Sequence, residues 1–154
     1  MSRAVRISAK ADYAIRAAAE LAAAPGLLKG DQIASEQGIP IKFLENILSE
    51  LRHAVLVASQ RGAEGGYALA RPAAEIRLAD VIRAVDGPLA HVRGTRPENL
   101  EYTGAAAPLR DVWIALRKNI RGVLERVTLA DLAAGELPAD VATLATDPEA
   151  WLPH

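Results

Sequence analysis

Three polar side chains of one predicted helix carry groups that could read the edges of DNA bases. Lys42, Glu45 and Asn46 have the i, i+3, i+4 spacing, which places them on one helix face. A lysine can bind phosphate or guanine, a glutamate can accept from the cytosine amino group, and an asparagine can pair with adenine. Ser49 and Arg52 extend the same face. A purely structural helix would also present such residues to solvent, so both interpretations are open at this point.

A glycine-rich turn, RGAEGGY at residues 61–67, follows this helix and begins with Arg61. Its glycines do not fit a phosphate-binding loop, because their spacing matches neither the Rossmann nor the P-loop pattern and no helix is predicted next. The flanking residues AVLVASQR and YALA are typical of two short strands, which predicts a β-hairpin with Gly62 to Gly66 at its turn. An arginine at the tip of this hairpin could enter the minor groove of DNA, where the potential is most negative.

The other reactive residue types form no pattern that predicts catalysis or metal binding. The sequence has no cysteine, which excludes disulfides, thiolate metal sites and a cysteine nucleophile. His53, His91 and His154 are too dispersed to suggest a metal site. No serine lies in a nucleophile-elbow motif, and Glu98 and Glu101 have no identifiable acid/base partner. We therefore expect neither an enzyme nor a cofactor.

Two helices joined by a tight glycine turn are predicted to position the polar face. Residues 31–38 form a short helix that ends at Gly38, and residues 40–53 form the helix that carries Lys42. The expected apolar stripe of this second helix comprises Phe43, Leu44, Ile47, Leu48 and Leu51. A β-ribbon that follows a helix-turn-helix is a wing.

Further helices surround this unit. Ser8 can cap a first helix, which Pro25-Gly26 stops, and a short helix is predicted over residues 78–85. Residues 89–107 are the longest stretch without a predicted element, and such loops are usually functional or mobile. The fold class is therefore mainly α with a small β-hairpin, as a winged helix-turn-helix with an additional long helix.

That long helix is predicted from Leu109, because apolar residues recur at helical spacing for about five turns. They are Val112, Trp113, Leu116, Ile120, Val123, Leu124 and Val127. The stripe is longer than the rest of this small chain could cover, so we expect it to pair with a second copy. Thr128 and Asp131 then have the capping-box spacing of another short helix, and the last twenty residues include one glycine, three prolines and four acidic residues.

The composition predicts a soluble protein without a membrane segment. Hydrophobic residues make up 51% of the 154 residues but aromatic residues only 4%, which favours a closely packed helical core. No apolar stretch approaches the roughly 20 residues of a membrane helix, and charges interrupt the N-terminus where a signal peptide would be apolar. We expect a cytoplasmic protein. The net charge of -1 gives no general argument for nucleic acid as a partner.

Three segments resemble the Rrf2 family of bacterial transcription regulators. They are ISAKADYAIRAAAELA, IPIKFLENILSELRHAVLVASQRGAEGGYALARP and IRLADVIRAVDGP, and a long helix running into VTLADL follows them. The resemblance covers residues 6 to about 134. It implies a homodimeric winged helix-turn-helix repressor that binds double-stranded DNA at a near-palindromic operator.

The resemblance also implies roles for individual residues. The face with Lys42, Glu45 and Asn46 would lie in the major groove, Arg61 would enter the minor groove, and Ser8 and Lys10 would approach phosphates. The chain would divide into a DNA-binding domain at residues 1–88, a sensor-type loop at 89–107, a dimerisation helix and short helix at 108–134, and a C-terminal extension at 135–154.

The absence of cysteine sets this chain apart from many relatives, which hold an iron-sulfur cluster through three loop cysteines. The corresponding stretch here is RGTRPENLEYTGAAAPLR. Asp12 matches a carboxylate that ligates the cluster in nitric-oxide-sensing members, but one oxygen ligand cannot hold a cluster, and an acid favourable to the helix dipole is the better interpretation. We expect no cluster.

Charged and aromatic residues of the loop suit a small organic effector instead, and a packed surface loop without a ligand is an equal alternative. The candidate effector residues are Arg93, Arg96, Glu98, Glu101 and Tyr102, near Trp113. A second function class is also open, namely a winged-helix module that contacts another protein and reads no DNA. Such a module would be expected to carry aromatic or apolar anchors on its reading face.

Overall fold

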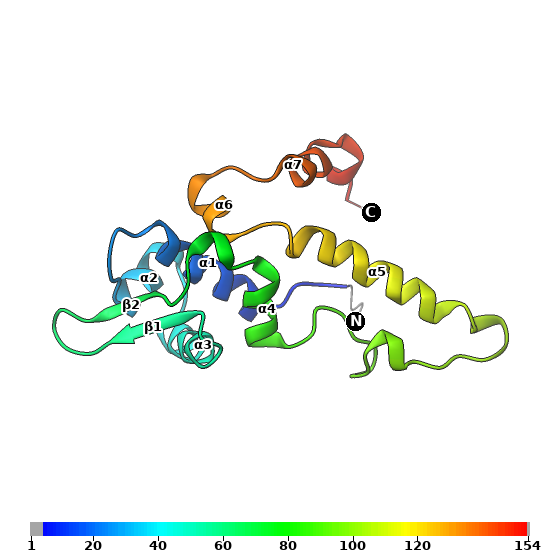
Figure 1. The fold of residues 1–154 in the computed structure, drawn as a ribbon, viewed down its shortest axis with the longest axis horizontal. Helices are drawn as coiled ribbons and strands as arrows, with labels where there is room; N and C mark the ends of the chain where they lie inside the picture. The colour runs from blue at the N-terminus through cyan, green and yellow to red at the C-terminus, as the bar shows by residue number, and fades with distance from the viewer. Residues whose placement is uncertain (1–4, 154) are drawn as a thin grey trace.

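The computed structural model describes residues 5–153, so His154 lies outside the described residues. Within this range the chain forms seven α-helices and one two-stranded antiparallel sheet (Figure 1). The predicted mainly helical fold with a small hairpin is confirmed. The elements are α1 (Ala9–Ala23), α2 (Gly30–Gln37), α3 (Ile41–His53), β1 (Val57–Gln60), β2 (Gly66–Leu69), α4 (Leu78–Asp86), α5 (Leu109–Leu124), α6 (Leu129–Ala134) and α7 (Ala139–Thr146).

The core lies where α1 packs against α3, α4 and α6. α1 contributes mostly small buried side chains, namely Ala11, Ala14, Ala17, Ala18 and Leu21. Alanine has the highest helix propensity, and its small side chain lets neighbouring helices approach closely. α3 contributes the larger side chains Leu44, Ile47, Leu48 and Leu51, which are all fully buried. The small residues of one helix therefore make room for the large residues of the other.

Local signals set the ends of the first three helices. The backbone N–H of Ala11 donates to Ser8 Oγ at 2.9 Å, so Ser8 caps α1 as predicted. α2 ends at Gly38, whose φ of 64° lies in the left-handed region that glycine adopts without a side-chain clash. Pro40 stands directly before α3 as its N-cap residue. Both helices of the predicted helix-turn-helix are present, with bounds that differ from the prediction by one residue.

The wing is the hairpin of β1 and β2, in register from Val57 opposite Leu69 to Gln60 opposite Gly66. The prediction placed Gly66 in the turn, but it is the first residue of β2. The strand accommodates a glycine at this position because the hairpin packs closely on the segment before α2. A Cβ at position 66 would lie only 2.6 Å from Leu28 O. Leu28 and Tyr67 exchange both backbone hydrogen bonds, at 3.0 and 2.7 Å.

α5 extends away from the helical core and has no buried residue (Figure 1). The helix ends at Leu124, so the prediction that Val127 belongs to its exposed stripe is wrong. Val127 is 2% exposed and lies in the connection to α6, where its carbonyl accepts from the Leu78 N–H at 3.0 Å. The Thr128 and Asp131 capping box of α6 is present as predicted.

Two segments for which no helix was predicted contain helical structure. Residues 89–107 include short 3-10 helices at Pro97–Asn99 and Gly104–Ala106. Residues 135–153 include α7 and a 3-10 helix at Pro148–Trp151. Both segments contain proline and glycine, but tertiary packing of residues such as Pro97, Leu100 and Val141, which are buried, orders the chain between them.

Candidate nucleic-acid interface

α3 presents one polar face to solvent and one apolar face to the core. Lys42, Glu45, Asn46 and Arg52 are exposed and Ser49 is half-buried, whereas the leucine-rich face is buried. Within residues 5–153, neither Lys42 nor Glu45 forms an ion pair. The structure therefore brings together the predicted reading residues, with two charged groups that are not neutralised by a neighbour.

Phe43 departs from the predicted apolar stripe of α3, because it is 54% exposed. It precedes Leu44 by one position, which turns its side chain by about 100° around the helix and away from the core. Its ring meets Tyr13 edge-on, with ring centroids 6.2 Å apart, and the Arg16 guanidinium lies 5.3 Å from the centre of the Tyr13 ring. Phe43 thus lies beside the polar face, at the edge between α3 and α1.

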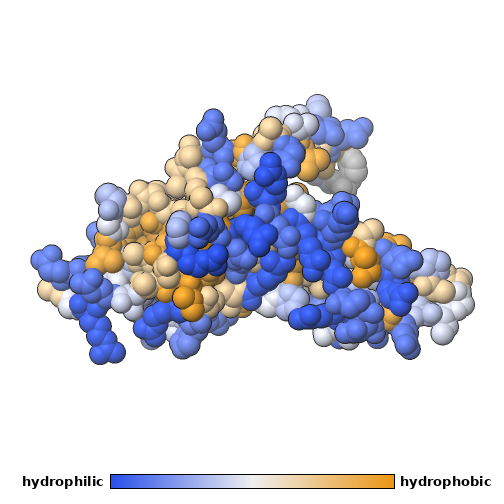
Figure 2. Space-filling view, viewed as in Figure 1, coloured by the Kyte–Doolittle hydropathy of each residue, from blue (hydrophilic) through white to orange (hydrophobic). Residues whose placement is uncertain are grey.

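The wing loop lies next to cations from other elements. Arg61 is exposed directly after β1, and Figure 2 shows hydrophilic side chains over the tip of the hairpin. Arg61, Arg52 and Lys29 all line a depression of about 330 Å³ beside the turn end of the hairpin. Three cations from α3, the wing and the residue before α2 therefore converge on one surface, which suits a phosphate backbone.

Lys29 was not among the residues predicted from the sequence. Its Nζ donates to Ala63 O at 2.8 Å, so the side chain reaches the wing loop 34 residues further along the chain. Arg52 Nη1 contacts Ser59 Oγ at 3.4 Å and links α3 to β1. No local pattern around Lys29 reveals this role, because it depends on how the hairpin folds back on the start of α2.

Ser8 and Lys10, predicted to approach phosphates, have partners within the protein. Ser8 Oγ accepts from Ala11 N and donates to Asp86. Lys10 Nζ lies 2.7 Å from Glu50 Oε1 and links α1 to α3. Lys10 also lines a surface depression that Asn46 and Ser49 share. It therefore lies beside the reading face, but with its charge compensated, and its phosphate contact stays a prediction.

Asp12, which matches a cluster ligand of some relatives, belongs to an ion pair. Arg16 Nη1 lies 3.0 Å from Asp12 Oδ2, one helical turn away on α1. The guanidinium also donates to Gln37 at the end of α2. Asp12 thus lies at the N-terminal end of α1, where a negative charge is favourable to the helix dipole, and helps to orient Arg16.

The structure divides the predicted effector residues into two groups. Arg96 and Glu98 line a cavity between α4 and α5, together with arginines of both helices. Tyr102 lies elsewhere, where its hydroxyl accepts a hydrogen bond from Trp113 Nε1 at 3.1 Å. Arg93 and Glu101 are exposed and do not line the cavity. The loop is thus attached to α5 at two places, through Trp113 and through the ion pair of Glu98 with Arg117 at 2.5 Å.

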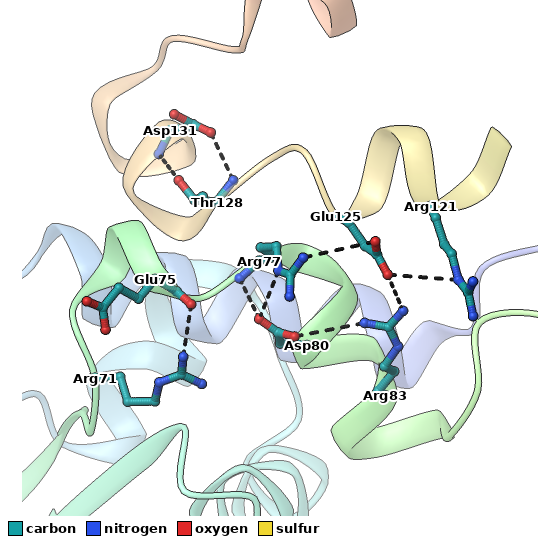
Figure 3. Close-up of polar contacts among 9 residues, drawn as sticks. All are labelled: Arg71, Glu75, Arg77, Asp80, Arg83, Arg121, Glu125, Thr128 and Asp131. Atoms are coloured by element: carbon teal, nitrogen blue, oxygen red, sulfur yellow. Dashed lines mark hydrogen bonds and ion pairs between the residues drawn. The ribbon is translucent and has the colours of Figure 1, made fainter. Parts of the chain in front are cut away.

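The carboxylate Glu125 connects α4 and α5 through several arginines (Figure 3). Arg83 Nη2 lies 2.5 Å from Glu125 Oε1, and Arg77 and Arg121 lie at 4.0 and 3.9 Å from its oxygens. The hydrogen bond from Arg83 lowers the pKa of Glu125 below its ordinary value, and the charges of all three arginines add to this effect. Glu125 therefore stays ionised at neutral pH.

The apolar side chains of α5 form an exposed face. Val112 is 53% exposed and Leu116 is 38% exposed, and Figure 2 shows hydrophobic atoms on this helix. Towards its C-terminal end, Ile120, Val123 and Leu124 line a groove of about 490 Å³ together with Val5 and Ile7 of the N-terminal segment. A large part of the predicted stripe is thus accessible to another molecule.

A helix-turn-helix followed by a β-hairpin, with an exposed polar face on the second helix and cations at the wing, defines a winged helix-turn-helix protein. The family model of Rrf2, described as an iron-dependent transcriptional regulator, matches residues 7–135. The chain belongs to the Rrf2 family of transcriptional regulators.

Relatives and solved structures agree with this assignment. The chain is 54% identical over 145 residues to a Mycobacterium tuberculosis protein named as an HTH-type transcriptional regulator, covering 93% of this chain and 90% of that protein. The structure of CymR, the global cysteine regulator of B. subtilis, matches with a TM-score of 0.73 and 34% identity over 86% of this chain and 98% of CymR. IscR of T. potens matches with a TM-score of 0.68 and 33% identity over 85% and 88% of the two chains.

The description of the family names iron, but the residues of this chain do not fit an iron site. The sequence has no cysteine. In the described part, residues 5–153, no three histidine, aspartate or glutamate side chains gather in a way that could hold a metal ion. Membrane crossing has no support in this range either, since no helix there combines the required length and apolar character.

Proposed function

We propose that the protein is a sequence-specific DNA-binding regulator that acts as a homodimer on a pseudo-palindromic operator. The observation that carries this proposal is the exposed polar face of α3 beside the cations of the wing. α3 would lie in the major groove, where Lys42, Glu45 and Asn46 meet base edges with matching donors and acceptors. Arg61 would enter the minor groove, as arginines do where that groove is narrow.

The homodimer is inferred from the exposed apolar face of α5. A contiguous apolar surface on a small protein marks an interaction site, and a second copy presents the same surface for a two-fold pairing. Its residues would be Val112, Trp113, Leu116, Ile120, Val123 and Leu124. A two-fold dimer would place two copies of α3 about 34–36 Å apart, which is one turn of DNA.

In this proposal each segment has a role. Residues 1–88 bind DNA, residues 89–107 are the sensor segment, residues 108–134 hold the dimer together, and residues 135–154 form an extension that includes α7. The regulator works without an iron-sulfur cluster and acts in the cytoplasm of a bacterium. Repression is the expected outcome, because a dimer bound across an operator excludes other proteins from the same DNA.

One observation favours the alternative of a protein-interaction module. Phe43 and Ile41 on α3 are 54% and 42% exposed, and exposed apolar residues are what a protein-contact face needs. DNA binding can account for them too, because apolar side chains contact the methyl group of thymine in the major groove. The charged and polar residues that surround Phe43 favour the DNA interpretation.

The proposal is tested by a mobility-shift assay with the DNA upstream of the protein's own gene and a scrambled DNA of equal length. We expect a retarded band with the upstream DNA that resists excess scrambled competitor. Replacing both Lys42 and Asn46 by alanine should remove this preference, whereas Glu36→Ala, an exposed change on α2, should preserve it. Equal binding of both DNAs, or none, would overturn the proposal and favour the interaction module.

A further inference from the structure

A cavity of about 480 Å³ lies between α4, the segment after it and α5. Four arginines line it, with Arg83 from α4, Arg96 from the sensor segment, and Arg117 and Arg121 from α5. The backbone and side chains of residues 87–90, which include Pro88 and Leu89, supply an apolar wall. The size falls within the range of about 300–1,000 Å³ that is usual for small-molecule sites.

The arginines outnumber the carboxylates that compensate them. Arg117 pairs with Glu98 at 2.5 Å, and Arg83 pairs with Glu125 at 2.5 Å and with Asp80 at 3.9 Å. Arg121 comes no closer than 3.9 Å to Glu125, and Arg96 forms no ion pair within the described chain, residues 5–153. The backbone and Arg117 lower the pKa of Glu98, so this carboxylate is ionised at neutral pH. Even with these three carboxylates charged, the four arginines leave one positive charge in excess.

We propose that this cavity binds a small organic anion that carries a carboxylate or phosphate group. The planar guanidinium groups match such oxyanions, because each can donate two parallel hydrogen bonds to one acidic group. Arg96 and Arg121 have donors available for it, and the wall at Pro88 and Leu89 can hold the organic part of the ligand. The inference rests on the proposed function, in which residues 89–107 are the sensor segment, and it supplies the class of effector.

The cavity lies between the proposed DNA-binding domain and the proposed dimerisation helix α5. α4 packs against α1 and α3, whereas α5 carries the exposed dimerisation face. An anion held by Arg96 of the sensor segment and by Arg121 of α5, beside Arg83 of α4, would join the part of the chain that follows α4 to α5. Binding would therefore favour one position of α5 relative to the reading helix over others.

The test is isothermal titration calorimetry of the full chain with citrate and with 3-phosphoglycerate, at a constant ionic strength of about 0.15 M. Glycerol serves as an uncharged probe. We expect at least one of the two anions to bind saturably, with one site per chain, and glycerol to give no binding heat. Arg96→Gln should weaken the affinity about tenfold or more, as the loss of a charge-assisted hydrogen bond does. This variant should fold normally, because Arg96 is exposed and forms no ion pair within residues 5–153.

Arg110→Gln is the matched control, since Arg110 lies at the start of α5 and does not line the cavity. Its affinity for the anion should equal that of the parent protein. Failure of both anions to bind, or an equal loss in the two variants, would overturn the inference.

The mobility-shift assay without any anion distinguishes this failure from failure of the proposed function. A chain that binds its operator but neither anion is a regulator without this effector site. A chain in which Arg96→Gln weakens operator binding while neither anion binds would show that the cluster contacts DNA phosphates instead.

Discussion

Arg61 is the residue whose proposed role depends most on the wing. It follows β1 directly and is exposed, and the loop from Arg61 to Gly65 is closed by a Gly65 N–H to Gly62 O hydrogen bond of 3.0 Å. Arg61→Ala should weaken operator binding by about 1–3 kcal/mol, because one groove contact is lost. Fluorescence anisotropy with labelled operator DNA measures this loss.

Glu64→Ala in the same loop is the control for Arg61→Ala, since it removes an exposed charge of opposite sign. It should leave binding equal or slightly tighter, because a carboxylate near phosphate is repulsive. Equal affinity of the Arg61→Ala variant and the parent protein would contradict the placement of the wing in a groove.

Lys10 has a structural role that can be separated from a contact with phosphate. Its Nζ lies 2.7 Å from Glu50 Oε1, and Glu50 Oε2 is a buried atom that has no hydrogen-bond partner among residues 5–153. Lys10→Met should lower the free energy of unfolding by about 1 kcal/mol, since both side chains are partly exposed to solvent. Urea denaturation checks this value.

The double variant Lys10→Met with Glu50→Gln should recover part of the loss in unfolding free energy, because no unpaired charge is left behind. If Lys10→Met leaves unfolding unchanged but weakens DNA binding, the side chain acts on phosphate and its ion pair with Glu50 contributes nothing to stability.

At the scale of elements, α5 has little support inside its own chain. It has no buried residue, and Leu116 is 38% exposed in the middle of its apolar face. Leu116→Glu should convert the dimer to monomer or aggregate, because a charge on each copy would meet its counterpart across a two-fold interface. Light scattering after size exclusion gives the mass directly.

Lys118→Glu, an exposed change on the same helix, is the control for the introduced charge alone. The measured mass of this variant should still be that of a dimer. A monomeric mass for the unaltered protein at micromolar concentration would show that the exposed face of α5 does not join two copies.

Elements with local signals could be predicted from the sequence. Ser8 caps the expected first helix, and Gly38 ends the expected second one. The two strands of the hairpin form at the two expected runs of strand residues. These signals act over a few residues and do not need the rest of the chain. The exposed polar face of α3 follows from helical periodicity in the same way.

Features that depend on distant contacts could not be predicted. Val127 continues the apolar spacing of Val123 and Leu124, yet the chain leaves the helix before it and buries it beside Leu78. Lys29 meets the wing only because the hairpin folds back. The arginine cavity joins positions 83, 96, 117 and 121, which no sequence motif connects. α7 was missed because proline and acidic residues surround it in the sequence.

At the scale of the whole molecule, ion pairs between segments make stability depend on pH. The pKa of Glu125 is lowered by Arg83 first of all, and the pKa of Asp140 is lowered by its hydrogen bond from Arg126, which attaches α7. A carboxylate with a lowered pKa contributes its full stabilisation of the folded state when the pH is above its ordinary pKa, which is 4.5 for glutamate. This contribution is lost as the pH falls below that value and through the folded-state pKa.

Glu125→Gln should therefore be less stable than the parent protein at pH 7, and the difference should shrink as the pH falls below about 4. Urea denaturation at several pH values between about 3 and 7 measures it. Glu101→Gln removes an exposed carboxylate without an ion pair in residues 5–153 and should behave as the parent does. A constant difference between Glu125→Gln and the parent at all pH values would contradict this role.

The backbone pairing of Leu28 with Tyr67 affects the rate at which the protein can associate with DNA. Because both backbone hydrogen bonds join the wing to the start of the helix-turn-helix, and Lys29 holds the loop at Ala63, the distance from wing to α3 is set during folding. The wing loop therefore has little conformational entropy to lose on DNA binding. A collision in the correct orientation can form a complex without a prior rearrangement of this loop. If α3 and the wing contact neighbouring grooves as proposed, the same rigidity predicts weaker binding to an operator in which one base pair is inserted between these two contacts.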